Sequence, residues 1–103
     1  MKTRREMLEE FLIQDPDDSF TRYALALECE KEGRVAEAVP LLREVITRDP
    51  AYVAGYYHLG RLLAQLGQIE EARESYRRGL DTAAAAGDQR ARNEMQEALD
   101  MLE

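Results

Sequence analysis

Residues 55–62, with the sequence GYYHLGRL, could bind a phosphate, because two glycines with four residues between them precede a basic side chain. A phosphate-binding loop also needs a lysine and a Ser or Thr there, at a strand-to-helix turn whose backbone N–H groups face the phosphates. Here Arg61 and Leu62 occupy those places, and the surrounding residues favour a helix, in which mid-helix N–H groups are already bonded. The segment is therefore not a nucleotide site, and Gly60 is expected to allow two helices to pack closely.

His58 and Cys29 are the single histidine and the single cysteine of the chain, which limits catalysis and metal binding. One histidine cannot build a zinc cluster, and Cys29 lies at a helical core position, where a thiol acts as a small buried hydrophobe. The carboxylates alternate with basic residues at helical spacing, as in Glu70, Glu74 and Arg73, which is typical of a solvated helix face. We therefore expect no enzymatic activity, no metal and no cofactor.

Composition and charge restrict the partners. The 103 residues are 45% hydrophobic and 34% charged, which indicates one small globular domain, and their net charge is −7. This charge repels nucleic acid and anionic membrane surfaces. The N-terminal residues are charged and unlike a signal peptide, and no apolar run is long enough to span a bilayer. The expected location is the cytoplasm, and the use of arginine rather than lysine suggests a bacterial source.

A period of 34 residues organises the chain. Comparing residues 15–47 with residues 49–81 gives eight identities in 33 positions, which signals a repeat architecture. The identical pairs are Asp15/Asp49, Pro16/Pro50, Tyr23/Tyr57, Leu25/Leu59, Gly33/Gly67, Glu37/Glu71, Ala38/Ala72 and Arg43/Arg77. Each unit divides into two helices at its glycine, where a left-handed backbone ends the first helix.

Six helices are predicted, over residues 3–14, 17–32, 35–48, 51–66, 69–85 and 88–102. The first begins with a capping box formed by Thr3 and Glu6, and Asp88 is expected to cap the last. An apolar stripe of Met7, Leu8, Phe11 and Leu12 follows the first cap. No helix is expected to be stable alone, so neighbours must bury each other's stripes.

A helix–turn–helix unit of 34 residues with these side chains resembles the tetratricopeptide repeat (TPR) family. The family pattern is carried twice, by Leu25, Ala26, Cys29, Gly33, Ala38, Leu42, Val45 and Pro50, and by Tyr56, Leu59, Gly60, Leu63, Gly67, Ala72 and Tyr76. Arg22 departs from it, because a large apolar residue is usual there, and Gly79 replaces an alanine.

The resemblance implies an all-α, right-handed α-solenoid of antiparallel helix pairs, with about six helices. The whole chain, residues 1–103, would form a single TPR-like domain. It would comprise a flanking helix over 3–14, repeats over 17–50 and 51–86, and a C-terminal capping helix over 88–102.

The resemblance also implies a protein-interaction module, whose ligand lies in a concave groove lined by the first helix of each repeat. The candidate groove residues are Phe20, Tyr23, Leu27, Tyr57, His58, Arg61 and Arg92. Tyrosine and arginine often anchor interfaces, and the arginines favour a peptide with an acidic group or a free C-terminus. Each of these side chains could instead pack against a neighbouring helix or pair with a nearby carboxylate.

Self-association is the alternative function. Apolar residues in the terminal helices could join copies of the chain into a structural homo-oligomer; they are Phe11, Ile13, Met95, Met101 and Leu102. Solenoid ends need polar residues to stay monomeric, and both terminal helices carry many charges. We therefore expect a monomer.

Overall fold

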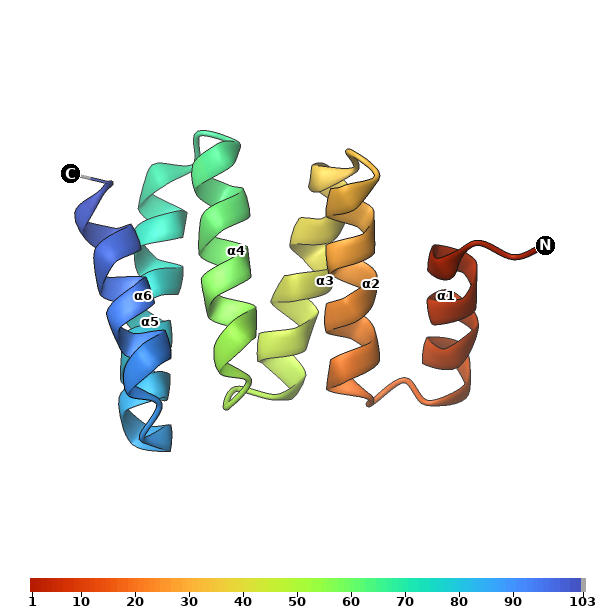
Figure 1. Ribbon diagram of the computed structural model, residues 1–103, viewed down its shortest axis with the longest axis horizontal. Coiled ribbons are helices and arrows are strands. Elements are labelled where there is room, and N and C mark those ends of the chain that lie inside the picture. The colour runs from red at the N-terminus through yellow and green to blue at the C-terminus, as the bar shows by residue number, and fades with distance from the viewer. Residues whose placement is uncertain (103) are drawn as a thin grey trace. The chain divides into compact units, whose positions relative to one another are not determined.

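The computed structural model describes residues 1–102, which form six α-helices and no strand (Figure 1). The helices are α1 (Arg4–Gln14), α2 (Ser19–Lys31), α3 (Val35–Arg48), α4 (Val53–Gln65), α5 (Ile69–Ala86) and α6 (Gln89–Asp100). They form two compact units, Met1–Asp49 and Pro50–Glu103, each holding three helices. The all-helical fold and the six helices are as predicted.

In the first unit, α2 packs against both α1 and α3. The predicted capping box starts α1: the Glu6 N–H donates to Thr3 Oγ1 at 3.1 Å, and the Thr3 N–H donates to Glu6 Oε1 at 2.9 Å. Asp18 caps α2 by accepting from the Thr21 N–H at 3.2 Å. Buried apolar side chains of α2 and α3 form the core; they are Ala24, Leu25, Ala26, Cys29, Ala38, Val39, Leu42, Val45 and Ile46.

In the second unit, α5 packs against both α4 and α6. Gly67 ends the first helix of the repeat with a φ of +80°, as Gly33 does in the first unit, which confirms the predicted turns. Asp88 caps α6 by accepting from the Ala91 N–H at 3.0 Å. The core comprises Tyr56, Leu59, Leu62, Leu63, Ala72, Tyr76, Ala83 and Met95.

Two glycines allow the helices of the second unit to approach closely. A Cβ atom on Gly60 would lie 2.6 Å from Cε1 of the buried Tyr76 ring, so Gly60 is a packing residue, as predicted. A Cβ atom on Gly79 would overlap the sulfur of Met95 and lie 2.8 Å from Cβ of Tyr56. The departure from the family pattern at Gly79 therefore makes room for α4 on one side and α6 on the other.

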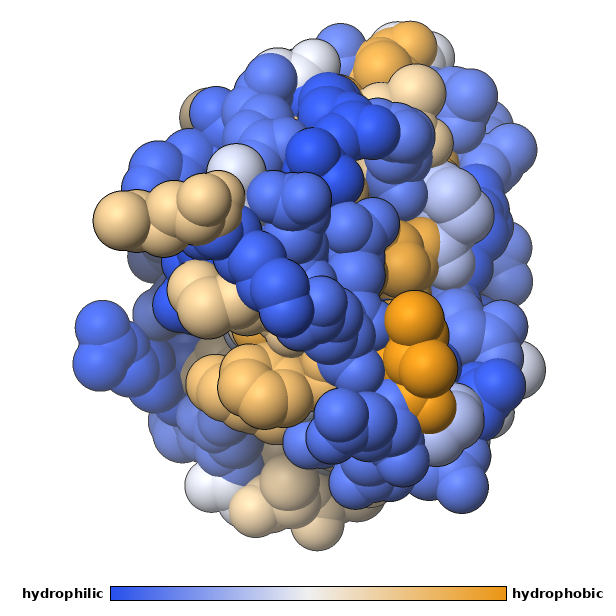
Figure 2. Space-filling model, turned by 90° about the vertical axis from the view of Figure 1, so that its right-hand side faces the viewer, coloured by the Kyte–Doolittle hydropathy of each residue, from blue (hydrophilic) through white to orange (hydrophobic). Residues whose placement is uncertain are grey.

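The structure differs from the prediction at several helix ends and in α1. Helices α2 and α4 begin two residues later than expected, after short turns that follow Pro16 and Pro50. The predicted apolar stripe of α1 is only partly covered: Leu8 and Leu12 are half-buried, whereas Met7 is 43% exposed and Phe11 is 58% exposed. Figure 2 shows the side of the molecule on which α1 lies, where apolar side chains interrupt the polar surface. Met95, which we named as a possible self-association residue, is instead fully buried.

Candidate functional site

A cleft of about 330 Å³ lies between α4 and α6 in the second unit. Its wall on α4 consists of Val53, Ala54, Tyr57 and His58, and its other wall consists of Asp88, Ala91 and Glu94. The cleft therefore combines small apolar side chains with aromatic and charged groups, which is the usual make-up of a site for a side chain of a ligand.

The aromatic residues on α4 form a connected wall. The rings of Tyr57 and His58 meet edge to face with centroids 5.4 Å apart, and Tyr57 lies 6.2 Å from the ring of Tyr76. Arg61 places Nη2 3.3 Å from Nδ1 of His58. Because a guanidinium has only donors, Nδ1 is the acceptor in this contact. The cation of Arg61 is thus held beside the cleft, one helical turn from His58.

The carboxylates on the opposite wall are engaged within their own helix. Asp88 accepts from the Ala91 N–H as the cap of α6, and Glu94 Oε1 accepts from Nε of Arg90 at 3.1 Å. A carboxylate at a helix N-terminus is stabilised by the helix dipole. These interactions offset part of the negative charge on the α6 wall.

The structure gathers only some of the predicted groove residues. Tyr57 and His58 line the cleft, and Arg61 contacts His58, whereas Arg92 lines a separate, smaller pocket of about 120 Å³. Phe20, Tyr23 and Leu27 lie on α2, in the first unit. Phe20 is 68% exposed, while Tyr23 and Leu27 are half-buried.

Sequence reasoning missed the contribution of α6 to this cleft. The sequence predicts Asp88 only as a cap, and the structure places both Asp88 and Ala91 in the wall of the cleft. Glu94 follows Ala91 by three residues, so the two share a helix face. That spacing is the one sequence signal that could have identified Glu94.

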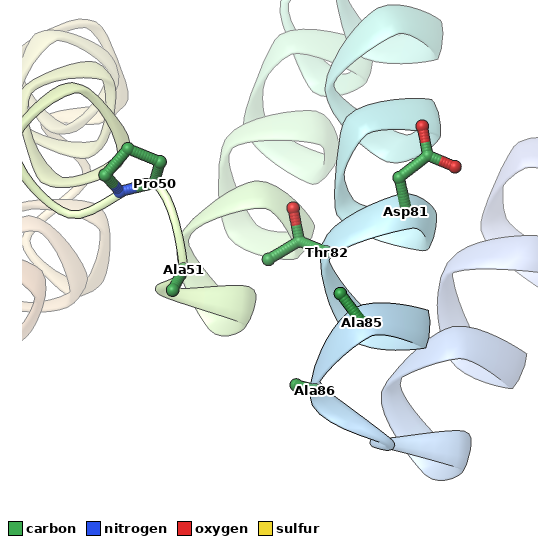
Figure 3. Close-up of a pocket in the computed structure, with 6 residues that line it drawn as sticks. All are labelled: Pro50, Ala51, Asp81, Thr82, Ala85 and Ala86. Atoms are coloured by element: carbon green, nitrogen blue, oxygen red, sulfur yellow. The ribbon is translucent and has the colours of Figure 1, made fainter.

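A second pocket, of about 480 Å³, lies beside the C-terminal half of α5 (Figure 3). Pro50 and Ala51 line it from the turn before α4, and Asp81, Thr82, Ala85 and Ala86 line it from α5. The Thr82 hydroxyl donates to the carbonyl of Arg78 at 2.8 Å. Its lining side chains are small, and none of them is aromatic or basic, so this pocket offers fewer anchoring groups than the α4–α6 cleft.

Within residues 1–102, no three His, Cys, Asp or Glu side chains are placed to hold a metal ion. Within the same range, every helix is too short or too polar to cross a membrane. Cys29 is buried, as predicted, and burial raises the pKa of its thiol.

Comparisons with known proteins agree with the repeat organisation. The family profile described as tetratricopeptide repeat matches residues 31–92. A TPR repeat-containing protein of Pseudomonas aeruginosa is 33% identical over 90 residues, covering 87% of this chain and 86% of its own length.

Two solved structures from bacteria share the fold. The tetratricopeptide repeat domain protein of Salinibacter ruber is 40% identical, with a TM-score of 0.82 over 86% of this chain and 90% of that one. Protein BPP2914 of Bordetella parapertussis is 31% identical, with a TM-score of 0.83 over 99% of this chain and 89% of that one. The repeated pattern, the helix pairs and these matches together establish that the chain belongs to the tetratricopeptide repeat family, a family of protein-interaction folds.

Proposed function

We propose that this protein is a non-catalytic interaction module that binds a segment of another protein in the α4–α6 cleft. The main observation in support is that a cleft of about 330 Å³ is lined by Tyr57 and His58 together with small apolar residues of two helices. Such a cleft accepts one apolar side chain of a segment, while Tyr57 supplies a rigid aromatic surface of the kind that anchors interfaces.

We propose an acidic group or a free C-terminus as the charged part of this segment. Arg61 supports this, because its guanidinium lies against His58 at the edge of the cleft and can form charge-assisted hydrogen bonds. The α6 wall carries Asp88 and Glu94, so the carboxylate of the segment would lie on the α4 side. Arg92 lines the adjoining smaller pocket and would contact a longer segment.

The first unit offers the equivalent face on α2. Phe20, Tyr23 and Leu27 stand 34 residues before Ala54, Tyr57 and Arg61, so each occupies the same place in its repeat. Phe20 is 68% exposed, so its ring is accessible to a partner. We propose that this face of the first unit also contacts partner protein.

The cleft is tested by selecting peptides from a random 12-residue display library and measuring their affinities by fluorescence anisotropy. Ala54→Glu should raise the Kd at least about tenfold, because a long charged side chain would enter the cleft from an exposed position. Thr82→Glu is the matched control, because Thr82 lines the other pocket of the same unit. Unchanged circular dichroism spectra and melting temperatures would show that both variants are folded.

Two results would contradict binding of a segment in the cleft. Equal affinity of the selected peptides for the wild type and Ala54→Glu would place binding elsewhere and refute the cleft. Failure of the library to yield any binder would refute recognition of a short segment.

The proposed contact between Arg61 and a carboxylate of the segment is tested separately. Amidating the C-terminus of a selected peptide should weaken binding to the wild type about three- to tenfold, and Arg61→Gln should remove that difference. Equal binding of the acid and amide forms by the wild type would refute a carboxylate site at Arg61.

A further inference from the structure

His58 and Arg61 lie one helical turn apart on α4 and contact each other through nitrogen atoms. Nη2 of Arg61 is 3.3 Å from Nδ1 of His58. A guanidinium has only donors, so Nδ1 accepts in this contact, and a ring nitrogen that accepts carries no proton. His58 is therefore neutral in this contact, with its proton on Nε2.

The imidazole of His58 is placed where it can exchange a proton while the protein is folded. The side chain lines the α4–α6 cleft and is only half-buried, so solvent reaches it. An unperturbed histidine titrates near pH 6.5, within the range in which most proteins work. Protonation of this ring is therefore a change that the cleft can undergo without unfolding.

Protonation reverses the part that Nδ1 plays. An imidazolium donates from both of its nitrogens, so Nδ1 can no longer accept from Nη2 of Arg61. Two cations in contact also repel each other. The guanidinium must then turn away from the ring and donate to another acceptor.

A carboxylate is an acceptor that both cations can share. Its two oxygens can accept from Nδ1–H of the imidazolium and from the guanidinium, and hydrogen bonds between charged partners are about twice as strong as neutral ones. Neutral His58 thus competes with a ligand carboxylate for Arg61, whereas protonated His58 helps to bind that carboxylate. The two effects have the same sign.

The other charged and titratable groups of the second unit that face this imidazole lie on all three of its helices. Asp88 and Glu94 of α6 form the opposite wall of the cleft and favour the protonated ring, whereas Arg61 of α4 opposes it. Tyr57 lies against the imidazole, and the ring of Tyr76 on α5 lies 6.2 Å from that of Tyr57. Because Arg61 is in hydrogen-bond contact with the imidazole, a change in the charge of the ring acts on Arg61 directly.

We propose that His58 is a positioning residue that controls Arg61 through its own charge. Neutral His58 holds the guanidinium against itself, and protonated His58 releases the guanidinium to a carboxylate of the bound segment. The inference rests on the proposed carboxylate contact of Arg61, and it adds that carboxylate binding is linked to the uptake of a proton. By this linkage, a lower pH strengthens carboxylate binding, and a bound carboxylate favours the protonated ring by the same factor.

A selected 12-residue peptide without histidine, prepared with a free and with an amidated C-terminus, tests this linkage. The ratio of the Kd of the amide to the Kd of the acid measures the carboxylate contact, and it cancels the effect of pH on the rest of the peptide. For the wild type this ratio should rise about three- to tenfold from pH 8 to pH 5.5. A C-terminal carboxyl group, with an ordinary pKa of about 3.5, stays ionised over this range.

Two variants separate the titration of His58 from other effects of pH. In His58→Asn the amide oxygen can accept from Arg61 near the place of Nδ1 at every pH, so the ratio should be the same at pH 8 and pH 5.5. His58→Leu removes the acceptor without adding a charge. Its ratio should also be independent of pH but larger than that of His58→Asn, because leucine does not compete for Arg61. Circular dichroism checks that both variants are folded.

NMR of the wild type gives a second measurement that needs no variant. The chain has one histidine, so every imidazole signal of the protein belongs to His58. The pH midpoint of its titration should be about 0.5–1 unit higher with the acid peptide bound than with the amide peptide bound, which is the same three- to tenfold change on a logarithmic scale.

Several results would overturn the role of His58 and leave the cleft in place. They are an acid-to-amide preference of the wild type that is equal at both pH values or falls at low pH, a pH dependence that persists in His58→Asn, and equal midpoints with the two peptides. Equal binding of acid and amide at both pH values would instead refute the carboxylate contact of Arg61, and this inference with it. A library without any binder would refute the proposed function itself.

Discussion

Gly60 and Tyr76 form a pair matched in size within the second repeat, and the first repeat has Ala26 and Leu42 at the equivalent positions. A larger residue on one helix is thus accompanied by a smaller one on the other. Cβ on Gly60 would lie within 3 Å of three ring atoms of Tyr76, and that ring is buried and cannot move away. Complementary volume, rather than either side chain alone, sets how closely the paired helices approach.

We therefore expect Gly60→Ala to lower the free energy of unfolding by up to about 2 kcal/mol. Overpacking costs about 1–3 kcal/mol, and the gain of about 1 kcal/mol in helix propensity offsets part of this cost. Adding Tyr76→Leu should recover most of the loss, since the double variant has the residue pair of the first repeat. Urea denaturation measures the free energy of unfolding of the single and the double variant. A double variant no more stable than Gly60→Ala would contradict the idea that the two side chains are matched in size.

Arg22 is a second residue that differs between the repeats. It is only 6% exposed, its Nη2 donates to the Pro16 carbonyl at 2.5 Å, and its Nη1 has no hydrogen-bond partner. Tyr56, at the equivalent position, donates its hydroxyl to the Pro50 carbonyl at 2.7 Å. The same proline carbonyl is thus satisfied in both repeats, but arginine leaves a buried N–H group unpaired.

Arg22→Tyr should therefore stabilise the protein by about 1–2 kcal/mol, because an unsatisfied buried donor costs about 1–3 kcal/mol. The reciprocal change, Tyr56→Arg, should destabilise it, because it removes the ring that the guanidinium of Arg78 covers at 5.3 Å. Chemical denaturation measures the free energy of unfolding of both variants and so checks both expectations. A loss of stability in Arg22→Tyr would show that Arg22 makes a favourable interaction.

At the scale of the helix, side-chain caps mark three of the six N-termini. Thr3, Asp18 and Asp88 each accept a backbone N–H at the start of α1, α2 and α6, whereas α3, α4 and α5 begin without a side-chain cap. The three uncapped helices depend more on packing within their unit. The caps do not decide how well a start was predicted: α3 and α5 begin at the predicted residues without a cap, whereas the capped α2 begins two residues later than predicted.

The cap of α2 predicts a dependence of stability on pH. Hydrogen bonds from the side chain and backbone of Thr21 lower the pKa of Asp18. A lowered pKa in the folded state means that the stabilisation is present above the unfolded pKa of about 4 and is lost as the pH falls below it. Asp18→Asn should therefore melt at a lower temperature than the wild type at pH 7, and the difference should shrink as the pH falls towards 2.

Thermal melts recorded by circular dichroism between pH 2 and pH 7 test this expectation. Asp81→Asn, on the exposed face of α5, is a control that removes the same charge at a position that caps no helix. If the two variants show the same pH dependence, the effect is one of net charge and not of the cap.

At the scale of the whole molecule, we expect residues 1–103 to unfold as a single domain. Each compact unit has about 50 residues, and chains of that size bury too little surface to be very stable alone. Cys29 reports on the first unit, because it is 5% exposed and burial raises its thiol pKa, so it should react slowly when folded. Tyr56 and Tyr76 report on the second unit.

In a urea titration, thiol reactivity of Cys29, tyrosine fluorescence and helicity should therefore change at the same midpoint. Reaction of Cys29 at urea concentrations that leave the tyrosine signal unchanged would show that the units unfold separately. Tyr23 lies in the first unit, so the Tyr23→Phe variant is needed to restrict the fluorescence signal to the second unit.

The sequence by itself determined the helices, the 34-residue repeat and the family, because these depend on spacing and on local backbone preferences. Gly33 and Gly67 could be placed at turns because a left-handed backbone favours glycine, and both have a φ of +80°. Thr3 and Asp88 could be named as caps because a cap is a local motif. Tyr57 and His58 entered the candidate site through the resemblance alone.

Only the tertiary structure decided features that depend on residues far apart in the chain. It places Met95 and Tyr56 against Gly79, makes Asp88 and Glu94 a wall of the cleft, and assigns Arg92 to a different pocket. It also leaves Met7 and Phe11 of the α1 stripe exposed, although the pattern predicted that the stripe would be buried. Periodicity shows that a helix has an apolar face, but the presence of a neighbour to cover it is decided by packing in three dimensions.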